Sequence, residues 1–553
     1  MKRYLVVFLI GTGFFSCKKS VTPPLEATAF NVTAVLVNSV TSANNAFFNV
    51  SLNPVIKISL SAPLDPATSN NNISLQANGA PVPVNITYAS NDSSVLLQTT
   101  SSLAGLTRYS VILTTSLASK QKINLSPAFS FTFITQIDST DKFPQISDSA
   151  LLTRIEQQTF KYFWDFGHPV SGLSRERTSS GDIVTTGGSG FGIMSMIVGV
   201  QRNFISRAEG LSRIDTIVNF LSNKATRYHG AFPHWINGST GATVPFSTQD
   251  NGGDLVETSY MMQGLLCARQ YFNSASDAKE ISLRNKINSL YNAVEWNWYR
   301  QNNQNVLYWH WSPNYNFAIN AQVSGWNEAL ITYVMAASSN IDSNKIPKIV
   351  YDNGWARNGG IKNGKSFYGI TLPLGPDYGG PLFFAHYSFL GINPHNLTDA
   401  YANYWQQDTA HAKINYLYCV ANPNHFYGYS NLCWGLTASD IQNGYTASSP
   451  TNDVGVIAPT AAISSLPYTP SESMNALRFF YYKLGNKIWS QYGFVDAFNL
   501  STLWYDSDCL AIDQGPEIVM IENYRSGLLW NLFMSCPEVK AGMGSLGFQS
   551  PNL

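Results

Sequence analysis

The pattern of apolar and polar residues changes character about a quarter of the way along the chain. Up to about residue 136, apolar residues come in short runs rich in β-branched and aromatic types, with turn residues between the runs. Such runs are typical of short strands that pack as a β-sandwich. After residue 148, apolar residues recur at helical spacing, first from Leu151 to Phe166. The sequence therefore predicts an all-β unit over 27–136, a polar linker over 137–147 and a helical domain over 148–553.

Two kinds of predicted helix alternate along the helical part. Helices that are apolar all round follow loops rich in glycine or containing proline, and amphipathic helices lie between them. The first kind is typical of buried positions and the second of covering positions. Six such pairs predict a mainly α protein with a closed (α/α)6 barrel, and a solenoid of helix pairs is the competing architecture. The buried helices are expected near Gly188, Gly253, Gly325, Gly380, Pro459 and Gly515, and the covering helices near 151–166, 207–226, 278–298, 341–351, 398–420 and 471–484.

Acidic residues gather where the predicted buried helices begin. The parallel inner helices of a barrel bring their N-terminal ends to one rim, where unpaired N–H groups favour anions. One acid at such an end is usually a helix cap, and Asp254 with Glu257 has the spacing of a capping box. Acids at several ends of one rim predict a functional site instead. The candidates are Asp250, Asp254, Glu257, Glu328, Asp440 and Asp513.

Composition narrows the class of ligand. Charged residues make up 12% of the chain, against roughly 25% in ordinary soluble proteins, aromatic residues make up 13%, and the formal net charge is zero. Because no cluster of Lys and Arg interrupts the body of the chain, we expect no nucleic-acid partner. A neutral, aromatic-rich surface suits a sugar polymer, although a large aromatic core accounts for the same composition. The candidate sugar-binding side chains, each of which could instead pack in the core, are His234, Trp235, Trp311, Trp326, Tyr378 and His386.

The acids match the needs of glycoside hydrolysis better than those of other reactions. Hydrolysis takes a carboxylic acid that protonates the leaving oxygen and a second carboxylate that activates water or attacks the sugar. Crowded carboxylates raise one another's pKa, which keeps one group protonated at neutral pH. The chain has no H-E-x-x-H motif, no phosphate loop and no G-x-S-x-G elbow, so we expect no metal and no cofactor. A polysaccharide lyase can share the helical barrel, but it handles acidic sugars and would need more Arg and Lys.

The first residues predict a lipid anchor. Met1–Arg3 is basic, Tyr4–Phe15 is apolar but too short to span a bilayer, and Ser16 precedes Cys17. This resembles a bacterial lipoprotein signal peptide over residues 1–17, with Cys17 as the lipidated residue. A secretory signal with an incidental cysteine is the alternative. We therefore expect a monomer in the cell envelope, in the periplasm or on the outer-membrane surface, that meets the membrane only through its anchor.

Two further resemblances rest on longer stretches of sequence. Seven blocks span the helical part: Thr186–Gly192, Gly230–Trp235, Asp250–Thr258, Tyr308–Pro313, Gly379–Ser388, Trp434–Asp440 and Ala511–Pro516. Together they resemble the glucoamylase-like domain of glycoside hydrolase family 144. This implies an (α/α)6 barrel that hydrolyses β-1,2-glucan with inversion and without a metal, either internally or by releasing sophorose from an end. Within the β unit, Ser61–Thr68 and Leu103–Tyr109 resemble a bacterial Ig-like module.

The family resemblance also implies roles for the acids. The acids of the family's pattern correspond to Asp254, Glu257 and Glu328, with Asp250 beside them. On this basis we expect Glu328 to be the general acid and Asp513 to be the base, acting through a chain of waters. The leading prediction is an endo-acting β-1,2-glucanase whose partner is a neutral β-glucan. The alternatives are a sophorose-releasing exo-enzyme of the same family and a non-catalytic glycan-binding lipoprotein.

Overall fold

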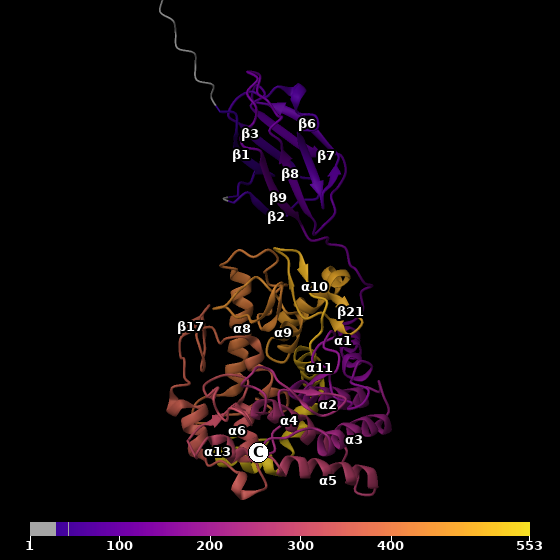
Figure 1. Ribbon diagram of the computed structural model, residues 1–553, viewed down its shortest axis with the longest axis vertical. Helices are drawn as coiled ribbons and strands as arrows, with labels where there is room; N and C mark the ends of the chain where they lie inside the picture. The colour runs from indigo at the N-terminus through magenta and orange to yellow at the C-terminus, as the bar shows by residue number, and fades with distance from the viewer. Residues whose placement is uncertain (1–28, 43) are drawn as a thin grey trace, which may run out of the picture. The chain divides into compact units, whose positions relative to one another are not determined.

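The computed structural model describes residues 29–42 and 44–553. Its internal contacts divide the chain into two units, with the boundary between Gln136 and Ile137 (Figure 1). The predicted signal peptide over 1–17 and the lipidation site Cys17 lie outside the described residues. In the part of the chain that is described, none of the helices combines the length and the apolar character needed to cross a membrane.

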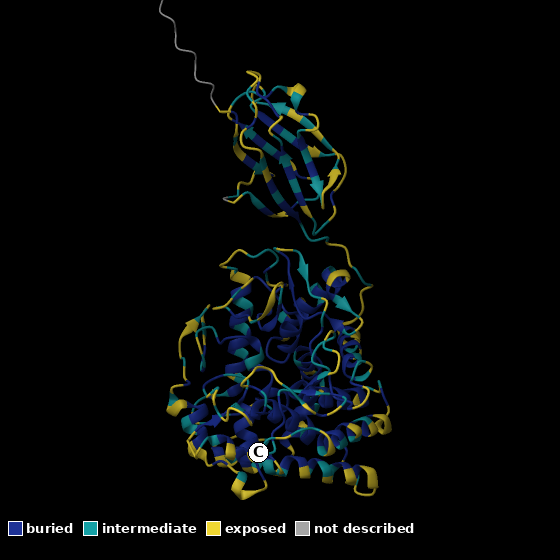
Figure 2. Ribbon diagram, in the orientation of Figure 1, coloured by how far each residue is buried: buried dark blue, intermediate teal, exposed yellow. Residues whose placement is uncertain are grey.

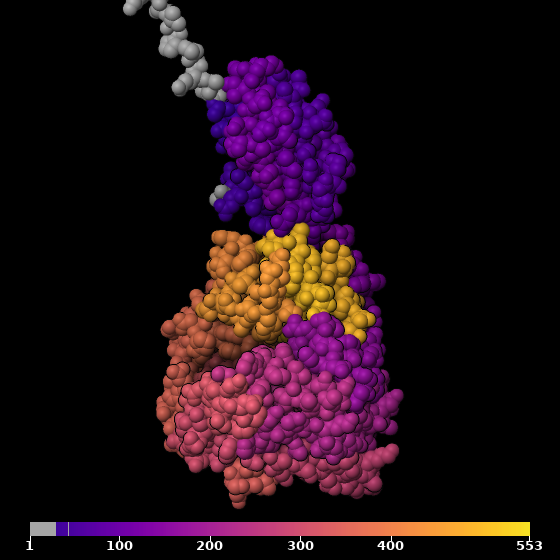
Figure 3. Space-filling view, in the orientation of Figure 1, coloured from indigo at the N-terminus to yellow at the C-terminus, as the bar shows by residue number. Residues whose placement is uncertain are grey.

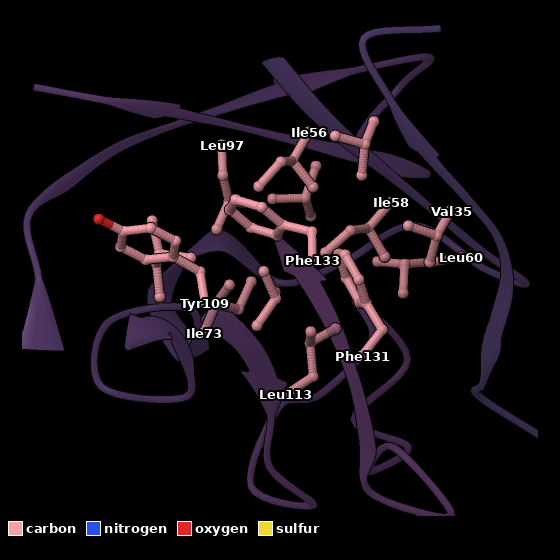
Figure 4. Packing of buried hydrophobic residues seen from close by; sticks show 14 of the residues in the cluster. Val35, Ile56, Ile58, Leu60, Ile73, Leu97, Tyr109, Leu113, Phe131 and Phe133 are labelled. Carbon is pink, nitrogen blue, oxygen red and sulfur yellow. The ribbon is translucent and has the colours of Figure 1, made fainter. Parts of the chain in front are cut away.

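The N-terminal unit is a sandwich of two sheets, as the strand pattern predicts. One sheet has the order β1 (Val32–Val37), β3 (Val55–Leu60), β7 (Ser94–Thr99) and β6 (Val84–Ala89). The other has the order β2 (Ala46–Val50), β9 (Phe129–Thr135), β8 (Arg108–Leu113), β4 (Ile73–Ala77) and β5 (Ala80–Val82). Alternate side chains of each strand point inward, because successive residues of a strand face opposite sides. Ile56 and Ile58 of β3 thus meet Phe131 and Phe133 of β9 in the core (Figure 4).

The second unit alternates buried and covering helices. The buried helices are α2 (Thr186–Gln201), α4 (Leu255–Tyr271), α6 (Leu330–Ala337), α9 (Pro459–Ser464) and α11 (Ala511–Ser526). The helices that cover them are α1 (Asp148–Trp164), α3 (Arg207–Asn223), α5 (Ala278–Asn292), α8 (Tyr404–Ala421) and α10 (Pro470–Ile488). Exposed residues line one side of the covering helices and are almost absent from α2 and α4 (Figure 2). The predicted mainly α architecture, an (α/α)6 barrel that follows an N-terminal sandwich in the sequence, is confirmed.

Two of the predicted helices are replaced by shorter elements. The covering helix expected near 341–351 starts only at α7 (Lys348–Val350) and continues as a π-helical segment, Tyr351–Trp355, because Pro347 lacks the N–H that a helix interior needs. At the inner position expected near Gly380, the chain forms two 3-10 turns, Leu382–Ala385 and Ser388–Leu390. Two helices near the C-terminus pack against the buried helices: α13 (Pro537–Leu546) contacts α6, and α12 (Leu528–Met534) contacts α4.

Helices α2 and α4 cross with their backbones in contact. A side chain at Gly190 would place its Cβ 2.2 Å from the carbonyl oxygen of Tyr260, and a Cβ at Gly264 would lie 2.1 Å from the carbonyl oxygen of Gly190. Real Cβ atoms do not approach so closely, so both positions need glycine at this crossing. The crossing brings the N-terminal ends of two buried helices together, with both labels near the centre of the helical domain (Figure 1).

Candidate active site

A pocket of about 350 Å³ opens where these N-terminal ends meet. In the space-filling view, the surface of the helical domain is hollowed where its orange and magenta segments meet (Figure 3). The pocket carries two kinds of lining. Its ionisable residues are Glu176, Arg177, His234, Glu257 and Glu328, and its aromatic residues are Trp235, Phe246, Tyr260, Trp309, Phe383, Tyr387 and Tyr445.

Asp254 is both a helix cap and the centre of a charge cluster. Its Oδ1 accepts a 2.9 Å hydrogen bond from the N–H of Glu257, which makes it the N-cap of α4. Its Oδ2 lies 3.0 Å from Nδ1 of His234 and 3.6 Å from Nε2 of His310. Burial alone raises the pKa of Asp254, but these two histidines and the cap hydrogen bond hold that pKa below its ordinary value. Asp254 is therefore ionised, with its Oδ2 beside both histidines.

The two histidines complete a small network with Asp250. Nε2 of His310 lies 3.3 Å from Oδ2 of Asp250, whose pKa is raised by burial and then by the charge of Asp254. Burial lowers the pKa of His234, but the charges of Glu257 and Asp254 outweigh burial and raise that pKa to about 9. His234, Asp250 and Asp254 have ligand atoms within 4.8 Å of one another, the spacing of a cation site. Since His234 already donates to Asp254, a cation would have to displace that proton.

Glu257 is fixed by the backbone of a neighbouring helix. Its Oε2 accepts a 2.6 Å hydrogen bond from the N–H of Gly187 in α2. Burial raises the pKa of Glu257 to about 7, and the charge of Asp254 adds to the rise, while His234 and the Gly187 N–H oppose it. The Gly187 hydrogen bond therefore fixes the position of the Glu257 carboxylate in the pocket wall, and the group is only partly ionised at neutral pH.

Glu328 faces the pocket with a free carboxyl group. It lies just before α6, and its carbonyl oxygen accepts hydrogen bonds from the hydroxyls of Ser388 and Tyr260. Within the described part of the chain, its carboxylate has no hydrogen-bond donor from another residue. Burial raises the pKa of Glu328 to about 7, with smaller contributions from Glu257 and Asp254. A partly buried carboxyl group that lines a pocket and has a pKa of about 7 is suited to give its proton to a ligand.

Asp513 belongs to a second cluster of acids behind the pocket wall. Its neighbours Leu510 and Ile512 line the pocket, whereas Asp513 itself is buried beside Asp496. Burial raises the pKa of Asp513 to about 7, and burial together with the charge of Asp513 raises that of Asp496 well above its ordinary value. Oδ2 of Asp496 accepts a 2.7 Å hydrogen bond from the N–H of Asp440. The two buried carboxyl groups therefore share a proton at neutral pH.

One arginine, Arg177, forms an ion pair with Asp440 of this second cluster. Nη1 of Arg177 lies 2.7 Å from Oδ2 of Asp440 and 2.9 Å from its Oδ1. Asp440, Asp496 and Asp506 have oxygens within 4.8 Å of one another, so they too have the spacing of a cation site. Nε of Arg177 also lies 2.8 Å from Oε2 of Glu176, so its single positive charge is shared between Asp440 and Glu176.

The predicted sugar-binding residues fall into two groups. His234 and Trp235 line the pocket, as expected. Trp326 and His386 do not: Trp326 packs on Trp355 and Phe389, and the ring of His386 bonds the hydroxyl of Ser465 at 3.0 Å. These two side chains are 5% and 2% exposed and do not line the pocket, so their contact with a sugar stays a prediction that this pocket does not support. Trp326 lies in the bend before α6, and His386 directly follows the 3-10 turn Leu382–Ala385.

Two other predicted sugar-binding residues lie outside the pocket. Trp311 is on β15 (His310–Trp311), which pairs with β13 (Gly253–Asp254), and its ring packs on Tyr228 and His229. Tyr378 packs on Phe367 in a separate apolar cluster.

Sequence reasoning missed several residues of the pocket and of the acid cluster behind it. Tyr445 reaches the pocket from β20 (Gly444–Ala447), which pairs with β19 (Ala438–Ile441). Asp496 lies between two short strands with no helix end to mark it. Nothing local marks either residue, because their place depends on long-range packing. Trp309, which also lines the pocket, lies in the block Tyr308–Pro313 that carries the family resemblance.

Comparison with known proteins identifies both units. A family model described as "Putative glucoamylase" matches residues 320–537, and one described as "Bacterial Ig-like domain" matches residues 31–135. The chain is 46% identical, over 420 residues, to an exo β-1,2-glucooligosaccharide sophorohydrolase (non-reducing end) of Parabacteroides distasonis. That match covers 72% of this chain but 58% of the relative, so the chain spans less than two thirds of the relative's length.

Solved structures share the same fold. An endo-β-1,2-glucanase from Chitinophaga pinensis, in complex with sophorotriose and glucose, is 52% identical with a TM-score of 0.72, covering 74% of this chain and 100% of its own. A β-1,2-glucanase from Parabacteroides distasonis is 36% identical with a TM-score of 0.71, covering 94% of this chain and 73% of its own. The chain therefore belongs to the glucoamylase-like glycoside hydrolases of family 144 and carries an N-terminal bacterial Ig-like domain.

Proposed function

We propose that the protein hydrolyses β-1,2-glucan and cuts within the chain to give sophoro-oligosaccharides. The observation that carries this proposal is the pairing of Glu328, whose pKa is raised to about 7 and whose carboxyl group takes no donor from another described residue, with a second buried acid, Asp513, around an aromatic pocket. The identity to the Chitinophaga pinensis endo-β-1,2-glucanase supports the choice of substrate, since this chain covers the whole of that enzyme.

In this mechanism Glu328 is the general acid. Its carboxyl proton passes to the glycosidic oxygen as the bond from that oxygen to the anomeric carbon breaks. A water molecule attacks the anomeric carbon from the opposite face and gives up a proton, so the configuration is inverted. Asp513 receives that proton through intervening water, because Leu510 and Ile512, not Asp513, line the pocket. Asp254, Asp250 and Glu257 hold the sugar and the histidines between these two groups.

An exo-acting, sophorose-releasing reaction is the second candidate. The 46% identity to the Parabacteroides distasonis sophorohydrolase favours it. Product profiles on long linear β-1,2-glucan separate the two: a ladder of oligomers supports endo action, and disaccharide alone supports exo action. A non-catalytic glycan-binding protein would release no product at all.

The test of the proposed function is hydrolysis of linear β-1,2-glucan beside β-1,3-, β-1,4- and α-1,4-glucans. We expect new reducing ends from the first substrate and no unsaturated product. Activity on α-1,4-glucan alone would refute the proposal. Glu328→Gln should lower the rate by about 10²–10⁴-fold, the usual share of a general acid, without loss of fold. Glu472→Gln, which removes a half-exposed surface ion pair with Lys413, is the matched control.

We also propose that the protein is a monomeric lipoprotein of the cell envelope, anchored through Cys17. The basis is the short basic and apolar leader that ends in Ser16-Cys17. Radiolabelled palmitate should enter the wild-type chain and not a Cys17→Ser variant, which should appear in the soluble fraction. Light scattering of the detergent-free Cys17→Ser protein should give the mass of a single chain.

A further inference from the structure

A second pocket, of about 330 Å³, lies outside the acid site and shares none of its lining residues. It forms over the 3-10 turn Trp296–Arg300 and the loop that follows it. Trp296 and Tyr299 are fully buried and fix this turn to the core, which leaves Trp298 pointing outward. Trp298 is 45% exposed, an unusual state for so large an apolar side chain.

The indole ring of Trp298 is a rigid platform with one open face. Its other face stacks on the ring of His229, with centroids 3.8 Å apart and planes at 16°. His229 is held in turn by Glu295, whose Oε2 lies 3.0 Å from its Nδ1, and by the edge of Trp311 at 5.0 Å. Because its backing is fixed, the indole needs little ordering to receive a flat ligand on its free side.

Polar groups surround this platform without protein partners. In the described structure, the side chains of Asn302, Asn303 and Ser343 make no hydrogen bonds, and all three line the second pocket. The backbone that carries the two asparagines is constrained, because Asn302 and Asn303 have φ of 65° and 60° and the guanidinium of Arg300 donates to the carbonyl oxygens of Asn303 and Gln304. The rim therefore offers neutral donors and acceptors on a constrained backbone.

We propose that Trp298 and this amide rim form a second binding site for a neutral pyranose chain. An aromatic face takes up the apolar face of a sugar ring, and amide and hydroxyl groups bond its equatorial hydroxyls. Arg300 donates to its own loop and does not line the pocket, and the ionisable residue of the lining, Glu295, is a carboxylic acid, so the lining supplies no positive charge to favour an acidic glycan. The proposed function identifies the chain as β-1,2-glucan, and on that point this inference rests on it.

Two sites on one chain would hold a long glucan that reaches both more tightly than the acid pocket alone, since the second contact is intramolecular. Binding is measured in native gels that contain linear β-1,2-glucan, with the full chain carrying Glu328→Gln as the parent. Adding Trp298→Ala to this parent should raise the dissociation constant for the polymer about fivefold, as expected for the loss of one stacking contact. A double change of Asn302 and Asn303 to Ala should weaken binding in the same direction. Tyr524→Ala, at a tyrosine that is 44% exposed and lines neither pocket, is the control.

Kinetics separate this inference from the proposed function. In the wild-type background, Trp298→Ala should raise KM for long glucan and leave kcat and the hydrolysis of short sophoro-oligosaccharides unchanged. Equal affinity of the Trp298→Ala and parent chains for the polymer would overturn the second site. If the wild-type chain cleaves no β-1,2-glucan, the proposed function fails, and the gels still decide whether Trp298 binds the polymer.

Discussion

Glu257 and Glu328 show how the same residue type acquires different roles within one pocket. Burial raises the pKa of each to about 7. Glu257 accepts a hydrogen bond from the backbone of α2, whereas the carboxyl group of Glu328 takes no donor from another described residue. The hydrogen-bonded carboxylate of Glu257 is suited to position its neighbours, and the free carboxyl group of Glu328 is suited to transfer a proton. The two residues therefore differ in their hydrogen-bond partners and not in their pKa.

The pH profile of hydrolysis tests the assignment of acid and base. Glu328 must be protonated, so the rate should fall as the pH rises through about 7, and Asp513 must be ionised, so the rate should fall as the pH drops below about 7. We therefore expect kcat/KM to have a narrow maximum near neutrality. A profile that stays flat from about pH 5 to 9 would contradict both assignments.

Asp496 should set the acidic limb of that profile. As a protonated partner it donates a hydrogen bond that favours the ionised form of Asp513. Asp496→Asn keeps a donor and should leave the acidic limb in place, whereas Asp496→Ala removes it and should move that limb upward by about one pH unit. Equal profiles of the two variants would show that Asp496 has only a structural role.

At the scale of the elements, the contact between α2 and α4 restricts which residue types can stand at the crossing. A methyl group at position 264 would meet the carbonyl oxygen of Gly190, which is backbone and cannot rotate away. Gly264→Ala should lower the free energy of unfolding by about 2 kcal/mol or more, as overpacking does. Gly544→Ala in α13 meets nothing within 4 Å and should raise it by up to about 1 kcal/mol. Urea denaturation of the two variants measures both effects.

Elements were predictable from the sequence where one local rule dominates. Helix α4 was expected from its apolar run and from the cap at Asp254, and it begins at Leu255. The helix expected across Pro347 failed because the proline rule overrides periodicity. The acids at helix ends were found for the same local reason. Asp496 was not, because it meets Asp513 only through the packing of distant strands, and a loop position such as that of Trp326 does not tell whether the side chain faces a pocket or the core.

At the scale of the whole molecule, the segment between the two units belongs structurally to the helical one. Phe143 packs on Tyr481 with ring centroids 4.6 Å apart, the N–H of Lys142 donates to the carbonyl oxygen of Tyr482 at 2.7 Å, and Nζ of Lys483 lies 2.7 Å from Oδ1 of Asp141. The stretch predicted as a polar linker therefore lies along α10.

Truncation checks this placement. A chain of residues 137–553 should match the full chain in its hydrolysis of β-1,2-glucan oligosaccharides, because no residue of the N-terminal sandwich lines the acid pocket. A chain of residues 148–553 loses the packing of Phe143 and should melt about 1–3 °C lower than the 137–553 chain. Differential scanning calorimetry of the two truncated chains decides it, and equal melting temperatures would show that the segment adds no stability.

The bond from the N–H of Gly187 to Glu257 has a consequence for how the site tolerates mutation. A backbone N–H persists through every substitution except proline, so the donor that fixes this carboxylate is almost independent of the amino acid encoded there. The space around it is not, because a Cβ at position 187 would lie 2.5 Å from Oε2 of Glu257. In a library of all substitutions at position 187, we therefore expect every side chain other than proline to lower activity for one reason, the lack of space for a Cβ atom, whatever its polarity or charge.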